Sequence, residues 1–302
     1  MGVLRQGHLS CGGYSFLTIS DENMFAKPIG ILIITLSFFG GFMLMGGNLL
    51  SLWHPSELVV ILGLALGTFL SSTPAHVWVR SVQFLGRYYA GERVTKKVYS
   101  DALGLLESLA RLSRSEGVLS LEKHIVDPDN SSLFASYPAV LKHPDLRKFI
   151  VDNFSYLLLN PPASQNFDHY MEDQIEDLVS SMSEAPKAIG KVADWLPGFG
   201  IVAAVLGVIL TMELLGGDMD VAKIGTAIGA ALVGTLTGVF FAFAVLAPVV
   251  HAMEIMIRQD RALLEMTASF LSAYANGVSP SLVVEIGRQR IPPEYEVPRD
   301  DY

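Results

Sequence analysis

Four apolar segments limit what this chain can fold into more than any other feature of the sequence. They cover about residues 28–46, 57–73, 197–212 and 221–250. A helix needs roughly 20 apolar residues to cross a bilayer. The second and third segments are short and the fourth is long, so we expect tilt or extension beyond the bilayer. The pattern predicts an all-α integral membrane protein, with four transmembrane helices in two hairpins and a helical cytoplasmic domain between spans two and three.

The composition agrees with a membrane protein and excludes several other classes. Only 17% of the residues are charged, whereas soluble domains have about a quarter, and the mean hydropathy is +0.41. The net charge of −9 argues against a nucleic-acid partner, because binding phosphates requires basic patches. The single cysteine, Cys11, excludes an internal disulfide and a thiolate metal cluster.

The distribution of Lys and Arg predicts which side of the membrane each connection faces. Residues 47–56 and 213–220 contain neither residue type, whereas residues 74–196 contain thirteen and residues 251–302 contain five. Positive charge stays on the cytoplasmic side of a membrane. We therefore expect both termini and residues 74–196 in the cytoplasm.

These observations divide the chain into five parts. Residues 1–23 have no apolar run of signal-peptide length, and Met24 opens the first apolar segment directly, so we expect translation to start at Met24. The predicted parts are an N-terminal extension (1–23), a first hairpin (24–73), a cytoplasmic helical domain (74–196), a second hairpin (197–250) and cytoplasmic C-terminal helices with a tail (251–302).

Apolar periodicity predicts the helices outside the membrane. A 4-3-4-3 spacing indicates one helix that Gly117 ends, and Ser164 is the candidate N-cap of a later helix through MEDQIEDL. The fourth span should continue to about Ala275, before Gly277, and Pro280 should open one more helix. The stripe of the first helix consists of Val98, Ala102, Leu105, Leu109 and Leu112.

The sequence offers little enzyme chemistry. It contains no GxxxxGK[ST], HExxH or GxSxG motif. A loose dinucleotide fingerprint at residues 198–203 lies in an apolar span with no strand before it, and the seven histidines lack metal-ligand spacing. We therefore expect no enzyme activity, no cofactor and no metal.

The apolar spans also lack charge. Residues 28–46, 58–73, 197–212 and 224–250 contain no Asp, Glu, Lys, Arg or His. Glu57 and Lys223 lie at span ends, a position from which both side chains can snorkel. Ionisable residues inside the membrane mark ion and proton relays. If the protein moves ions, the titratable group must come from another chain.

Small residues gather instead on the second hairpin, where they let helix backbones approach closely. They fit packing between the chain's own helices and packing against a partner helix equally well. These residues are Gly200, Ala203, Ala204, Gly207, Gly225, Gly229, Gly234 and Gly238.

Three further stretches carry a resemblance to a known family. SLEKHIVDPDNSSLFASYP begins at Ser120, LPGFGIVAAVLGV begins at Leu196, and VGT at 233–235 is followed by Pro248. In this order, and from about Met24 to Arg290, the chain resembles the MotA family of flagellar motor stator subunits. A TolQ- or ExbB-like energising subunit is the alternative, although those proteins typically have three spans.

The resemblance implies an ion-driven, torque-generating stator subunit in the bacterial inner membrane. MotA-like chains form a ring, thought to be a pentamer, around two MotB-type subunits. Each MotB-type subunit supplies a helix with the ion-binding aspartate, and the cytoplasmic part of the ring pushes the rotor protein FliG.

The resemblance also assigns roles to individual residues. Arg114 and Glu122 match the charged rotor-contact residues. At about 100° per residue, Arg114 lies roughly 160° from the centre of the apolar stripe and should face water. The alternative is a solvated helix face whose surface pairs contribute about 0–1 kcal/mol each.

Within the spans, Pro197 and Pro248 match the two coupling prolines of the family. Pro197 is expected in the first turn of the third span, and Pro248 should kink the fourth. Thr235 matches a pore-facing hydroxyl, and Ala204 stands where sodium-driven relatives have Thr. Because Ala204 offers no side-chain oxygen to sodium, we expect the ion to be a proton.

Overall fold

The computed structural model of the chain describes residues 29–90, 94–159, 166–215 and 221–297, and this part contains helices and no strand. The expectations for residues 1–23 and Ser164 lie outside the described residues. The principal helices are α3 (Pro55–Ser72), α4 (Ala75–Ala90), α5 (Lys96–Glu116), α9 (Pro144–Leu159), α10 (Phe167–Leu215), α11 (Val221–Phe240), α12 (Ala247–Ala275) and α13 (Pro280–Arg288). The short ones are α2 (Gly41–Leu44), α6 (Glu122–Val126), α7 (Ser132–Ala135) and α8 (Pro138–Leu141).

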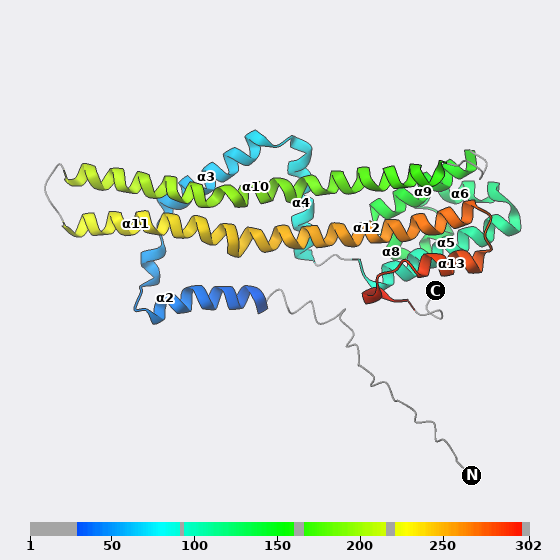
Figure 1. Cartoon of the computed structure of the whole chain (residues 1–302), viewed down its shortest axis with the longest axis horizontal. Coiled ribbons are helices and arrows are strands. Elements are labelled where there is room, and N and C mark those ends of the chain that lie inside the picture. Colours follow the sequence, from blue (N-terminus) through cyan, green and yellow to red (C-terminus); the bar gives the residue numbers. More distant parts are fainter. Residues whose placement is uncertain (1–28, 91–93, 160–165, 216–220, 298–302) are drawn as a thin grey trace, which may run out of the picture.

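Two long antiparallel rods organise the fold. One is α10, and the other is α11 followed by a π-helical turn, Phe241–Leu246, and α12. They lie side by side along the long axis of the molecule (Figure 1), with α3 and α4 against α10. The helices α5 to α9 and α13 pack around the far ends of α10 and α12, and together these segments form what we call the head.

Three helical runs are long and apolar enough to cross a membrane: Leu49–Ser72, Phe167–Glu213 and Ile224–Ala275. The first predicted span corresponds to a shorter apolar helix, Ile29–Leu44. The expectation that the fourth span continues to Ala275 is confirmed, because α12 ends there. Gly277 follows with a φ of +73°, and Ser279 is then the residue directly before α13, with Pro280 at its first turn.

The expectation for Pro197 is wrong. It lies inside α10, which begins at Phe167 and also contains Pro186. A proline inside a helix removes one backbone hydrogen bond and costs about 3 kcal/mol. In α10 this loss is offset by packing, since Leu196 is buried against Ile61 and Ala242. The sequence pattern suggested a helix start because proline is common there.

Three hydrophobic cores follow one another along the rods. The head core joins α5, α9, α10, α12 and α13. The stalk core consists of Phe84, Met182, Ala185, Ile189, Val249, Met253 and Ile257. The span core consists of Ile61, Ala65, Leu196, Ala203 and Ala242.

In the head, α5 is more deeply enclosed than one apolar stripe predicts. Ala102, Leu105 and Leu109 are buried as expected, and so are Tyr99 and Leu103 on neighbouring faces. The helix ends at Gly117, which has a φ of +89°, as the sequence predicts.

Candidate functional site

Glycines form a close contact between α10 and α11. A methyl group on Gly200 would lie 2.9 Å from the carbonyl oxygen of Gly234, and one on Gly238 would lie 2.6 Å from the carbonyl oxygen of Leu196. No side chain fits at these distances, so the two backbones touch. A methyl group on Gly207 would lie 3.0 Å from the Cβ of Ala231 and 3.3 Å from its Cα.

Not all the small residues serve this contact. A methyl group on Gly225 or Gly229 would meet no atom within 4 Å. Their neighbours Ile228 and Leu232 are exposed. Of the two alternatives that the sequence leaves open, packing within the chain therefore accounts for Gly200, Gly207, Gly234 and Gly238. The face of α11 around Gly225 has no partner within the described part of this chain.

The close contact brings together the two residues predicted to lie along an ion pathway. A methyl group on Gly234 would lie 3.5 Å from the backbone nitrogen of Ala204. A methyl group on Gly200 would lie 3.2 Å from the Cα of Thr235. Ala204 and Thr235, from two different helices, therefore lie at one level of the bundle. Both are only partly buried in the single chain.

A carboxylate lies at the same level, which corrects the expectation that Glu57 snorkels from a span end. Its side chain is 8% exposed. Its Cγ is 3.3 Å from the position of a methyl group on Gly234, and Oε2 accepts a hydrogen bond from the Ser56 hydroxyl at 2.8 Å. The spans of this chain therefore enclose a carboxylate of their own.

The link before α3 explains why this carboxylate was misplaced from the sequence. The 3₁₀ turn of this link, Leu49–Leu52, packs against α11. As a result, α3 begins beside the middle of α11 and not beside its end. Glu57 lies in the first turn of α3, where the helix dipole favours negative charge. An acidic residue just after a helix-opening proline is the signal that could have indicated this position.

The two prolines that match the family border one core. Leu196, next to Pro197, belongs to the span core, and Leu246, two residues before Pro248, packs against it. Pro248 is the second residue of α12, directly after the π-helical turn. Because proline has no N–H, the helix cannot keep its regular hydrogen bonds there. Pro248 thus follows an irregular turn, and the kink expected at this proline stays a prediction.

The two charged residues predicted to contact a rotor lie elsewhere, at the head. Arg114 is in the last turn of α5, and Glu122 begins α6. Both are exposed, as the helix geometry predicts for Arg114. They lie at the opposite end of the molecule from α11 (Figure 1), so the molecule has two separate candidate sites.

Exposed apolar side chains accompany these charges. Leu119, in the 3₁₀ turn between Arg114 and Glu122, is 77% exposed, and Val126 at the end of α6 is 76% exposed. Both lie within four residues of Glu122 in the sequence, so they add exposed apolar area near its charge. We call Arg114, Leu119, Glu122 and Val126 the tip surface. The sequence stripe did not indicate its apolar members.

A buried histidine supports the tip surface from beneath. His124 of α6 is buried, and its Nδ1 is 2.8 Å from the Ser131 hydroxyl. Burial, and then the nearby charge of Lys123, lower the pKa of His124 below its ordinary value of 6.5. At neutral pH its imidazole is therefore uncharged. In residues 29–90, 94–159, 166–215 and 221–297, no three His, Cys, Asp or Glu side chains are grouped to hold a metal ion.

Comparisons with known proteins agree with the resemblance seen in the sequence. Residues 28–117 match the model of the motility protein A N-terminal region, and residues 145–272 match that of the MotA/TolQ/ExbB proton channel family. The chain is 32% identical over 265 residues to the chemotaxis protein LafT of Vibrio parahaemolyticus, covering 88% of this chain and 92% of that protein. It is 31% identical to motility protein A of Salmonella typhimurium, covering 87% and 88%.

Two solved structures share the fold. The structure of MotAB from C. jejuni superposes with a TM-score of 0.71 at 21% identity, covering 89% of this chain and 96% of the matched chain. The flagellar MotAB stator complex from Bacillus subtilis gives a TM-score of 0.66 at 21% identity, covering 85% and 92%.

Proposed function

The chain belongs to the MotA/TolQ/ExbB proton channel family, and from this premise we propose that it is the ion-driven, torque-generating A subunit of a flagellar motor stator. The observation that carries the proposal is the similarity to LafT over 88% of this chain and 92% of that protein. The match of residues 28–117 to the motility protein A N-terminal model favours this function over a TolQ- or ExbB-like one. The role is mechanical and not enzymatic.

The subunit would act with a MotB-type partner and with copies of itself. The unpartnered face around Gly225 supports this part of the proposal, because small residues let a second helix approach closely. The partner would place its ion-binding aspartate near Ala204 and Thr235. We infer a ring of five such chains around two partner subunits, in the bacterial inner membrane.

We further propose that the chain crosses the membrane four times, with the helix Ile29–Leu44 as the first span. Both termini and the head would lie in the cytoplasm, since residues 74–196 contain thirteen Lys and Arg residues. In this arrangement 24–73 and 197–250 are the two hairpins, whereas 74–196 and 251–302 are cytoplasmic. The tip surface would then face the rotor protein FliG.

The ion would be a proton. A sodium ion must lose water and find several oxygen ligands, and Ala204 supplies no side-chain oxygen beside Thr235. A proton needs only a carboxylate and a path of water. Pro197 and Pro248, which border the same core as the pathway, would pass a change at the aspartate on to the head.

The test is rotation in a bacterium whose own stator genes are deleted and which produces this chain with a MotB-type partner. We expect rotation that continues when sodium is removed at constant membrane potential and pH, and that stops with a protonophore. Rotation that needs sodium would contradict the choice of ion. Absence of rotation despite assembled complexes would contradict the function. Vesicles that contain only this chain should show no proton flux, because the partner's aspartate is missing.

A further inference from the structure

A buried carboxylate lies between two hydrophobic cores on α12. The stalk core includes Val249 and Ile257 of this helix, and the head core begins at Leu263. Between them, Asp260 occupies a core position and is 1% exposed. A charged residue almost never lies so deep without a partner, so its partners indicate what it holds together.

Two side chains that are distant in sequence bind Asp260. An Arg87 guanidinium nitrogen, from the last turn of α4, donates to Oδ2 at 3.1 Å and to Oδ1 at 3.4 Å. The Nε2 of His143, directly before α9, is 3.2 Å from Oδ1. The carboxylate of Asp260 on α12 therefore joins this helix to α4 and to the head. The helix α4 follows the second apolar segment, and α12 follows the fourth.

The hydrogen bonds of His143 determine which of its nitrogens carries a proton. The N–H of Leu146 donates to Nδ1 of His143 at 3.4 Å, so Nδ1 is an acceptor. A neutral imidazole with an acceptor at Nδ1 carries its hydrogen on Nε2. His143 therefore donates to Asp260 through Nε2 while it caps the first turn of α9. The position of the head is tied to Asp260 through this ring.

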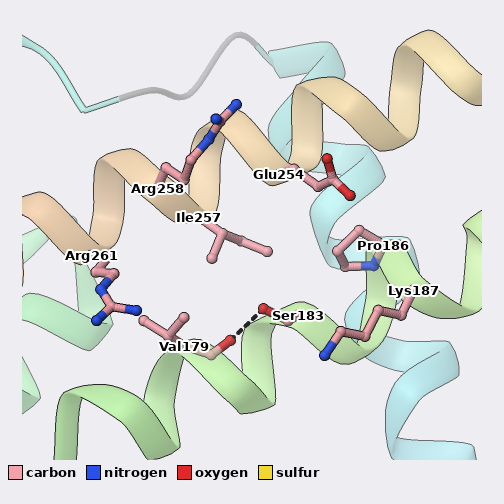
Figure 2. Close-up of a pocket in the computed structure, with 8 residues that line it drawn as sticks. All are labelled: Val179, Ser183, Pro186, Lys187, Glu254, Ile257, Arg258 and Arg261. Carbon is pink, nitrogen blue, oxygen red and sulfur yellow. Dashed lines mark hydrogen bonds between the residues drawn. The ribbon is translucent and has the colours of Figure 1, made fainter.

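The neighbouring rod is also irregular close to this level. Pro186 of α10 lacks an N–H, so the carbonyl of Met182 has no regular helical donor. Figure 2 shows Pro186 facing Ile257 of α12 across a cleft, and Arg261 also lines it. The cleft has a volume of about 310 Å³. Ile257 and Arg261 bracket Asp260 in the sequence, so the cleft between the two rods lies within one turn of Asp260 along α12.

Stability alone does not account for a charge at this position. Apolar side chains of similar volume often replace buried ion pairs with no loss of stability, whereas hydrogen-bonded charges hold their partners in fixed directions. Asp260 lies where both rods leave the stalk core and enter the head. A directional contact there sets the angle of the head relative to the spans, which apolar packing defines less strictly.

We propose that Asp260, with Arg87 and His143, is a positioning joint that fixes the orientation of the head on the membrane spans. The proposal rests on the proposed stator function, because the joint matters for how motion in the spans reaches the tip surface. Asp260 touches neither the ion pathway nor the rotor in this account. It acts through the two helices and the α9 cap that it holds.

The test separates torque per complex from the number of complexes. The chain and its MotB-type partner are produced in a strain without its own stator, and motors carrying a bead under high load are followed as complexes join one by one. The number of speed steps counts the complexes, and the step height measures the torque of each. The variants are Asp260→Asn and the apolar triple change Asp260→Leu, Arg87→Met and His143→Leu. Glu254→Gln, an exposed carboxylate on the same helix, is the matched control.

We expect both joint variants to give the wild-type number of steps with loss of most of the step height, and the control to match the wild type. Asp260→Glu should restore part of the height, because it keeps the charge. Full step height in the apolar variant would overturn the proposal, because the polar network would then not be needed for torque. Fewer steps of normal height in the joint variants would also overturn it, because the network would then serve only folding. Failure of both joint variants to assemble would overturn it for the same reason. If the wild-type chain itself produces no steps, the stator function fails and not the joint.

Discussion

A methyl group on Gly200 would lie 2.9 Å from the carbonyl oxygen of Gly234, which makes this glycine pair one of the points where the antiparallel helices α10 and α11 touch backbone to backbone. Ala204 and Thr235 lie within one turn of this pair along their own helices, and the Cγ of Glu57 is 3.3 Å from the position of a methyl group on Gly234. The contact therefore determines both how the hairpin packs and what surrounds the proposed ion pathway.

We expect Gly200→Ala to destabilise the complex by about 1–3 kcal/mol, because the added methyl group forces the two backbones apart. Gly198→Ala, two residues away on the same helix, is the control, since a methyl group there meets no atom within 4 Å. Thermal unfolding of the detergent-purified complex measures the difference. Equal stability of the two variants would mean that α10 and α11 do not pack as described.

Glu57→Gln should slow rotation several-fold without reducing the amount of complex in the membrane. The amide keeps the volume of the side chain, but it removes a carboxylate that lies beside the Ala204–Thr235 level. Speed at low load, where ion transfer limits rotation, is the measurement. Glu213→Gln changes an exposed carboxylate near the C-terminal end of α10 and is the control. Unchanged speed in Glu57→Gln would exclude the carboxylate from the pathway.

Reversing a charge on the tip surface should weaken torque while assembly stays normal. Arg114→Glu and Glu122→Lys are expected to be mild singly, because exposed charges share the contact and salt screens them. Leu119→Ser should add to either defect, since it removes exposed apolar area from the same surface. Swimming with matched membrane amounts is the measurement. Lys97→Glu, exposed at the other end of α5, should have no effect.

A reciprocal charge reversal on the rotor should restore part of the swimming lost in Arg114→Glu. Such rescue distinguishes a direct contact from a general loss of function. If no rotor charge restores any variant of the tip surface, a direct contact through these charges is excluded.

His124 should make the stability of the head depend on pH. Its pKa in the folded chain is below the unfolded value of 6.5, so the unfolded chain binds the proton more readily. Stability is therefore fully present above pH 6.5 and is lost as the pH falls from 6.5 toward the folded pKa. His124→Gln should flatten this dependence. The measurement is the unfolding midpoint of the purified complex above and below pH 6.5. If the midpoint of the variant falls with pH as steeply as that of the wild type, the dependence comes from other groups.

Periodicity and hydropathy are properties of local sequence, and they predicted the elements of this fold well. The apolar stripe from Val98, the helix end at Gly117, the continuation to Ala275 and the start at Pro280 all follow from spacing and turn chemistry. The exposure of Arg114 followed from the same geometry. The ion-pathway, proline and rotor-contact roles came from the family resemblance and remain proposals.

The sequence by itself determined that the chain is helical and that it contains apolar segments of membrane-spanning composition. It also determined that residues 47–56 and 213–220 lack Lys and Arg, whereas residues 74–196 contain thirteen. Only the tertiary structure decided that Pro197 lies inside a helix, that Glu57 is buried beside Gly234 and that Asp260 joins Arg87 to His143. These three depend on contacts between residues far apart in the chain. A local pattern records the preference of a segment, whereas the depth and the partners of a charge are set by which helices pack against it.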